Sequence, residues 1–214
     1  MTERPDRRSA TTDRIRVILA DDEALIRDAV AMLLGLDADI DVVGVAASGT
    51  EAVALVAKVT PDVAVLDLHM PGLDGLQVAG RLREEAPDVG IVIVTSHPRP
   101  GHLKRALASG VRGFLPKTSS AQVLGAAIRK VAAGGRYVDP ELAADAISAG
   151  DSPLTGREAD VLDLSAGGTT IEDIAARAHL APGTVRNYLS SAMAKLGAAN
   201  RHEAERVARE HGWI

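Results

Sequence analysis

The chain has 214 residues, 46% of them hydrophobic and 25% charged, which is enough to form one or two folded domains. It has no cysteine, which excludes a disulfide framework, thiolate metal sites and a cysteine nucleophile. The net charge of -5 argues mildly against a nucleic-acid partner, but the window 184–209 has five basic and two acidic residues, a net charge of +3.

The two ends of the chain differ in character. Residues 1–14 have no apolar periodicity, so we expect a mobile tail, and their polarity does not resemble a signal sequence. No apolar run approaches the roughly 20 residues that a membrane span needs. We therefore expect a cytoplasmic protein with no membrane contact.

Residues 15–134 alternate between strand and helix patterns. Short β-branched runs predict strands at 16–20, 41–46, 63–66, 91–94 and around 114–115. Apolar residues at helical spacing predict helices from about 25 to 35 and over 49–58, 75–85, 101–109 and 120–133. This alternation predicts an α/β fold, a five-stranded doubly wound parallel sheet with right-handed crossovers.

Polar side chains follow four of these strands. Asp21 and Asp22 come after the first strand, and Asp67, Thr95 and Lys117 follow the third, fourth and fifth. In a parallel sheet these positions share one edge, where three carboxylates would repel one another unless a hard cation such as Mg²⁺ binds them. Asp67 is then a candidate nucleophile for a phosphoryl group, whose charge Lys117 would neutralise and whose oxygen the Thr95 hydroxyl would contact. Each residue alone has an ordinary structural explanation, and only their joint placement favours this chemistry.

With LDLHMPGLDG around Asp67 and GFLPK ending in Lys117, this part of the chain resembles the flavodoxin-like receiver domain of two-component response regulators. The resemblance implies that a sensor histidine kinase phosphorylates Asp67. It also implies that Asp22, Asp67 and the His69 carbonyl ligate Mg²⁺ while Asp21 acts mainly through water. Phe114 would be the switch aromatic, turning inward when Thr95 moves toward the phosphoryl group.

Two details qualify this resemblance. Receivers often have proline directly after the lysine, with a cis bond, whereas here Thr118 follows Lys117; a cis bond there would cost about 3–4 kcal/mol. His69 and His97 belong to no zinc-ligand pattern, and we expect both to be solvent-exposed loop residues. Residues 135–152 are predicted to be a semi-flexible linker with a short helix at 141–148.

Residues 153–214 keep a helical period throughout and predict four short helices that form a helix-turn-helix module. Thr155 and Glu158 have capping-box spacing for the first helix. A tight turn at 179–183 precedes a third helix, predicted to open at Thr184 with an inward stripe of Val185, Leu189, Met193 and Leu196. Asn200 with Glu203 is expected to cap the fourth helix.

The other face of the third helix carries small and amide side chains that suit a DNA major groove. Arg186 can read guanine and Asn187 adenine, while hydroxyls and the helix N-terminus can meet phosphates. A solvated face or a protein contact is the alternative. The candidate DNA-binding residues are Thr184, Arg186, Asn187, Ser190, Ser191 and Lys195.

The motifs LTGREADVLDL, DIAARAHLAPGTVRNYL and KLGAANRHEA resemble the LuxR-type DNA-binding domain of NarL/FixJ regulators. The resemblance places Arg186, Asn187 and Ser190 against bases and Thr184 against the DNA backbone. Ala181 stands where the family often has a capping serine, which would weaken the helix N-cap by about 1 kcal/mol. TVRNYLS and the GWI terminus look closer to the DesR-like branch.

These features predict a transcription regulator rather than an enzyme, apart from the receiver's own phosphoryl transfer and dephosphorylation. A kinase would phosphorylate Asp67, and the phosphorylated homodimer would bind double-stranded promoter DNA, with RNA polymerase as a further candidate partner. The dimer is expected to involve the first and last receiver helices. The alternatives are a phosphate-independent regulator whose receiver acts as a docking module, and a small phosphotransfer enzyme with another substrate.

Overall fold

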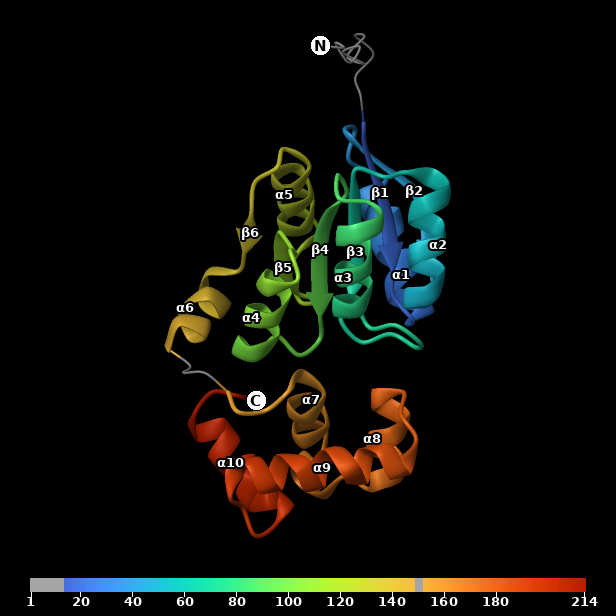
Figure 1. Ribbon diagram of the computed structural model, residues 1–214. Helices are drawn as coiled ribbons and strands as arrows, with labels where there is room; N and C mark the ends of the chain where they lie inside the picture. The colour runs from blue at the N-terminus through green and yellow to red at the C-terminus, as the bar shows by residue number, and fades with distance from the viewer. Residues whose placement is uncertain (1–13, 149–151) are drawn as a thin grey trace, which may run out of the picture.

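The computed structural model of the protein describes residues 14–148 and 152–214. The predicted tail therefore lies outside the described residues, except for Arg14. Figure 1 shows two parts, which we call the sheet domain (residues 14–148) and the helical domain (residues 152–214). Across these ranges, none of the helices is both long and apolar enough to cross a membrane.

The sheet domain alternates strands and helices as expected, and the predicted bounds of its strands lie within one residue of those in the structure. Its strands are β1 (Ile15–Ala20), β2 (Ile40–Ala46), β3 (Val63–Asp67), β4 (Gly90–Thr95), β5 (Gly113–Pro116) and β6 (Tyr137–Val138). Its helices are α1 (Ala24–Leu34), α2 (Gly49–Val59), α3 (Gly75–Glu85), α4 (Pro100–Ala108), α5 (Ala121–Ala132) and α6 (Pro140–Ser148).

The sheet has six strands among the described residues, one more than predicted, in the order β2-β1-β3-β4-β5-β6. All neighbours are parallel, and the additional strand β6 pairs Tyr137 with Gly113 and Val138 with Phe114. A two-residue strand is too short to show a periodic pattern, so the sequence predicts residues 137–138 as part of the linker.

Helices cover both faces of the sheet, so its central strands are buried on both sides. One core cluster joins the sheet to α2, α3, α4 and α6, and the other joins it to α1 and α5. Leu142 and Ala146 of α6 belong to the first cluster, so this predicted helix packs against the sheet domain. The segment between the domains is therefore ordered by apolar burial at least as far as Ser148.

Helix α1 has an exposed apolar face. Leu25 is 84% exposed and Met32 74%, and among the residues of α1 only Leu34 is fully buried. Large apolar side chains at this exposure do not stabilise the isolated fold. They leave a surface that another molecule could cover.

The helical domain consists of α7 (Gly156–Leu164), the short 3-10 helix η1 (Ala166–Gly168), α8 (Ile171–Ala178), α9 (Pro182–Leu196) and α10 (Arg201–Glu210). The predicted caps at Thr155 and Asn200 are confirmed: Thr155 and Glu158 form a capping box, and the Asn200 side chain accepts from the Glu203 N–H. One small core, with Leu162, Ile174 and Val185 at its centre, holds the helices together.

Helix α9 begins at Pro182, so the predicted start at Thr184 is wrong by two residues. Pro182 occupies the first turn, where its fixed φ suits a helix and its missing N–H leaves no unpaired donor. Ala181 is the N-cap and makes no side-chain cap hydrogen bond, as the sequence predicted. Within the stripe, Val185 and Leu189 are buried, while Met193 and Leu196 are partly buried against the same core.

Candidate functional site

Three carboxylates meet at the carboxyl edge of the sheet. Asp21 and Asp22 follow β1, and Asp67 is the last residue of β3, which pairs directly with β1. Ligand atoms of the three side chains lie within 4.8 Å of one another. Asp21 and Asp67 are buried, while Asp22 is partly open to solvent. The structure thus brings together the acidic residues that the sequence placed at separate strand ends.

Lys117 reaches into the same cluster from the end of β5. Its Nζ lies 2.8 Å from Asp21 Oδ2 and 3.1 Å from Asp67 Oδ2. It also lies 3.0 Å from Glu23 Oε1, a contact that the sequence did not predict. Burial by itself would lower the pKa of Lys117, but these carboxylates raise it well above its usual value. Lys117 therefore remains a cation at the centre of the cluster.

Asp67 has a carboxyl group with a strongly raised pKa. Burial raises its pKa to about 7; the positive charge of Lys117 opposes this rise, and the charge of Asp21 adds to it. Near neutral pH, the ionised form of Asp67 therefore depends on positive charge nearby. A close-packed turn holds the residue, because a side chain at Gly75 would overlap the main-chain oxygen of Asp67.

The donor set fits Mg²⁺. Asp21, Asp22 and Asp67 offer only oxygen atoms, which hard cations prefer, and Lys117 supplies less positive charge than the three carboxylates carry. The raised pKa of Asp67 also reflects this shortage of positive charge, because a buried carboxylate without a compensating cation is high in free energy. The residues present therefore suit the cation that the sequence predicted.

The two predicted switch residues belong to β4 and β5, the strands that follow β3 in the sheet. Thr95 ends β4 and is fully buried, and its Oγ1 accepts a hydrogen bond of 3.1 Å from the His97 N–H. The Phe114 ring is also fully buried and belongs to the core shared with α4. The ring thus already has the inward position that the sequence resemblance assigns to the phosphorylated state.

The helical domain lies against this carboxyl edge (Figure 1), and residues from both domains line a cavity of about 370 Å³ beside Asp67. The helical domain contributes Asp160 and Leu164 from α7, Arg177 from α8, and His179. His179 Nε2 lies 3.2 Å from Asp22 Oδ2, so the helical domain reaches one of the predicted Mg²⁺ ligands. No local sequence signal predicts this contact, because its partners come from separate domains.

Ionic contacts hold the two domains in this arrangement. Arg99 forms an ion pair with Asp163, and Arg157 Nη2 lies 2.9 Å from Asp74 Oδ2. Helix α7 supplies the helical-domain partner in both pairs, and its side chains are largely buried there. These pairs hold α7, whose Asp160 and Leu164 line the Asp67 cavity, against the sheet domain.

Asp160 of α7 faces two histidines of the sheet domain. Its Oδ1 lies 2.6 Å from His102 Nε2, and its Oδ2 lies 3.9 Å from His69 Nε2. Burial would raise the pKa of Asp160, but the His102 contact and other nearby positive groups lower it to about 2. Burial lowers the pKa of His69 to about 4, although Asp160 opposes this effect. The expectation of an exposed His69 is therefore wrong, because α7 covers it, whereas His97 is exposed as predicted.

The predicted DNA-binding residues divide into two groups in the structure. Arg186, Asn187 and Ser190 are exposed on α9, and Thr184 is partly exposed. Ser191 and Lys195 instead contact the buried Glu158: the Ser191 hydroxyl donates to Oε1 at 2.6 Å, and Lys195 Nζ lies 2.7 Å from Oε2. The contact between the domains leaves the first group accessible.

Comparison with known proteins agrees with the two-domain organisation of the structure. Residues 17–129 match the family described as "Response regulator receiver domain", and residues 152–208 match "Bacterial regulatory proteins, luxR family". The chain is similar to "Transcriptional regulatory protein DesR" of Bacillus subtilis, with 42% identity over 94% of this chain and 99% of the relative. It is also similar to the uncharacterised regulator YvfU of the same organism, with 40% identity over 94% and 100%. A solved RcsB–DNA complex matches 92% of this chain and 98% of its own chain, with 25% identity and a TM-score of 0.61.

Proposed function

We propose, because this chain belongs to the NarL/FixJ family of response regulators, that phosphorylation of Asp67 controls its binding to DNA. The chain combines a receiver domain with a LuxR-type DNA-binding domain, as transcriptional regulators of two-component systems do. Regulators of this kind interact with histidine kinases and bind DNA. Asp67 is the proposed phosphoacceptor, and a sensor histidine kinase is the proposed donor. The cytoplasm is the proposed location.

The geometry around Asp67 supports this assignment. A carboxylate oxygen of Asp67 would form a bond to phosphorus as the bond from phosphorus to the donor's imidazole nitrogen breaks. Lys117 already lies 3.1 Å from Oδ2 and would neutralise part of the phosphoryl charge. Mg²⁺, held by Asp22, Asp67 and the His69 carbonyl, with Asp21 acting through water, would supply further charge neutralisation. The receiver would also catalyse its own dephosphorylation.

The proposed signal passes from Asp67 to the helical domain. A phosphoryl group would add negative charge to a cavity whose walls already contain Asp22 and Asp160. The added charge would repel Asp160 and attract Arg99 and Arg177, which also line the cavity, so the ionic contacts between the domains, including the Arg99–Asp163 pair, would rearrange. Thr95 would turn its hydroxyl toward the phosphoryl group, and Phe114 would hold the inward position that it has here.

Release of the helical domain would allow two copies to bind adjacent half-sites. Arg186, Asn187 and Ser190 are accessible on α9 and are the proposed base contacts, with Thr184 at the DNA backbone. Ser191 and Lys195 would contact DNA only after leaving Glu158. The exposed apolar face of α1, together with α5, is the proposed dimer surface, and RNA polymerase remains a further proposed partner.

The decisive experiment removes the phosphoacceptor. Asp67→Ala and a matched control, Asp88→Ala at an exposed carboxylate, are treated with acetyl phosphate and Mg²⁺. Their affinities are measured for a duplex selected from random DNA with the phosphorylated wild-type protein. Wild type and Asp88→Ala should bind more tightly after treatment, and Asp67→Ala should not respond. An equal response of Asp67→Ala would disprove the mechanism.

A phosphate-independent docking function is the second candidate. The inward Phe114 and the accessible face of α9 favour it, because both are present without a phosphoryl group. Intact-mass measurement decides between the two functions. Absence of phospho-Asp67 with every small donor and Mg²⁺, combined with tight DNA binding, would support the docking function.

A further inference from the structure

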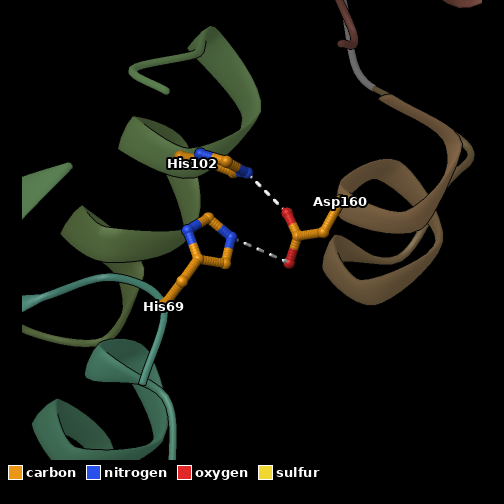
Figure 2. A group of neighbouring side chains, drawn as sticks. All are labelled: His69, His102 and Asp160. Carbon is orange, nitrogen blue, oxygen red and sulfur yellow. Dashed lines mark hydrogen bonds and ion pairs between the residues drawn. The ribbon is translucent and has the colours of Figure 1, made fainter. Parts of the chain in front are cut away.

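Three potential metal-ligating side chains converge where the two domains meet (Figure 2). His69 comes from the loop after β3, His102 from α4 and Asp160 from α7, and both imidazole rings direct Nε2 toward the same carboxylate. One ligand atom from each residue lies within 4.8 Å of the other two. This cluster shares no residue with the acidic cluster of Asp21, Asp22 and Asp67. Unlike that cluster, it offers two nitrogen atoms as ligands.

A backbone contact orients His102 for ligation. Its Nδ1 lies 3.1 Å from the carbonyl oxygen of His97. A carbonyl can only accept a hydrogen bond, so Nδ1 donates in this contact, and Nε2 is the nitrogen that faces Asp160 and would ligate a metal. A bound metal would displace the proton that Nε2 and the Asp160 carboxylate share in their 2.6 Å contact. Histidines that bind metals are commonly held in this way, with the second ring nitrogen donating to a carbonyl or carboxylate.

Two imidazole nitrogens and one carboxylate oxygen suit a divalent transition metal such as Zn²⁺ better than Mg²⁺ or Ca²⁺, which prefer oxygen. Three protein ligands would leave the fourth tetrahedral position for water. His69 and Asp160 both line the cavity of about 370 Å³ between the domains, so there is space for that water. His102 and Asp160 are each less than 10% exposed, which keeps the other sides of the site dry.

Ligation requires a small local rearrangement. Two ligands at about 2.0–2.1 Å from tetrahedral zinc lie roughly 3.3 Å apart. The two histidines now contact different oxygens of Asp160, since His69 Nε2 lies 3.9 Å from Oδ2 and His102 Nε2 lies 2.6 Å from Oδ1. The carboxylate must therefore turn, and the shorter contact must lengthen, before one oxygen and both rings can bind the same ion. Arg105 Nη2 lies 3.9 Å from Asp160 Oδ1, but its side chain is 32% exposed and can turn to solvent.

We propose that His69, His102 and Asp160 form a binding site for a divalent transition metal of the Zn²⁺ type. Since His69 and His102 belong to the receiver and Asp160 to the DNA-binding domain, the complete site exists only when the domains are in contact. A bound metal therefore stabilises the closed arrangement by mass action. The site needs neither a phosphoryl group nor DNA, so it does not depend on the proposed function.

The test uses untagged, full-length protein stripped with EDTA and returned to excess Mg²⁺, which keeps the acidic cluster from competing for the probe. Zn²⁺ affinity is measured by calorimetry, and Co²⁺ serves as a spectroscopic probe of tetrahedral nitrogen and oxygen ligation. The wild type should bind one ion, with Co²⁺ absorption typical of a tetrahedral site. His102→Ala and Asp160→Asn should weaken binding at least about 100-fold, because even loss of a group supporting a ligand costs 10–100-fold. The matched control His202→Ala, at an exposed histidine on α10, should bind as the wild type does.

His69→Ala separates ligation from folding, because this side chain is partly exposed and its loss leaves the buried His102–Asp160 contact in place. Its circular dichroism should match that of the wild type while its Zn²⁺ affinity falls. In X-ray scattering, Zn²⁺ should decrease the radius of gyration of the wild type but not that of His69→Ala. Absence of Zn²⁺ binding by the wild type, or wild-type affinity in His69→Ala and Asp160→Asn, would overturn the proposal.

Discussion

At the scale of single residues, Glu158 shows how one buried carboxylate can organise a domain. It completes the capping box of α7, and it accepts contacts from Ser191 and Lys195 of α9. Burial would raise its pKa, but Lys195, Ser191 and Thr155 together lower it to about 2. The sequence predicted the capping box, because its spacing is local, but it could not show that Ser191 and Lys195 face Glu158.

The lowered pKa of Glu158 gives a pH dependence with a defined sign. A carboxyl group with a depressed pKa stabilises the fold above its unfolded pKa of about 4.5, and this stability is lost as pH falls toward about 2. We expect wild type to lose about 1–2 kcal/mol more than Glu158→Gln across this range, since solvent reaches Lys195 and screens the pair. Urea unfolding followed by the fluorescence of Trp213 measures this difference.

The control for this prediction is Glu172→Gln, which alters a glutamate that is 71% exposed on α8. Its stability should vary with pH as that of the wild type does. If Glu158→Gln shows the same loss between pH 5 and 2 as the wild type, the assigned ionic contacts do not stabilise the domain.

At the scale of elements, the strand and helix bounds of the receiver were predictable because parallel α/β sheets impose strong local patterns. Strands such as β3 are continuous apolar runs, and helices such as α3 begin at a capping residue, here Asp74. The patterns do not determine which apolar residues are covered. Apolar residues at helical spacing predicted α1, yet two of them, Leu25 and Met32, lie exposed.

The exposed face of α1 leads to a prediction about assembly. Met32→Glu places a charge in the proposed dimer surface, so dimerisation in beryllofluoride and Mg²⁺ should weaken at least about tenfold. Monomer stability should hardly change, because Met32 is 74% exposed in the single chain. Analytical ultracentrifugation measures the dimerisation constant, and urea unfolding measures the stability.

Ile147→Glu is the matched control, because Ile147 is 86% exposed but lies on α6. This variant should dimerise as the wild type does. Equal weakening by both substitutions would indicate a general effect of charge, and unchanged dimerisation of Met32→Glu would exclude α1 from the interface.

At the scale of the whole molecule, the contact between the domains places α7 over the cavity beside Asp67. The Arg157–Asp74 pair contributes to this contact and lies outside the lining of that cavity. Arg157→Ala should therefore favour the open arrangement without altering the residues that meet a phosphodonor. We expect acetyl phosphate to phosphorylate Asp67 up to about tenfold faster, the effect of an interaction of roughly 1.4 kcal/mol.

Intact-mass spectrometry over time measures this phosphorylation rate. The control Arg206→Ala removes an arginine that pairs with Glu210 within α10 and should leave the rate unchanged. A rate for Arg157→Ala equal to that of the wild type would show that the contact between the domains does not limit access to Asp67.

The sequence by itself determined the two domains, the alternation of elements and the acidic edge around Asp67. These depend on local periodicity and on the rule that parallel strands end at one edge, so neighbouring residues carry the information. Only the tertiary structure decided the pairing of β6, the exposure of α1 and the meeting of His69, His102 and Asp160. These contacts join segments that are distant in the chain, and their energies depend on burial and charge in three dimensions, which no local spacing records.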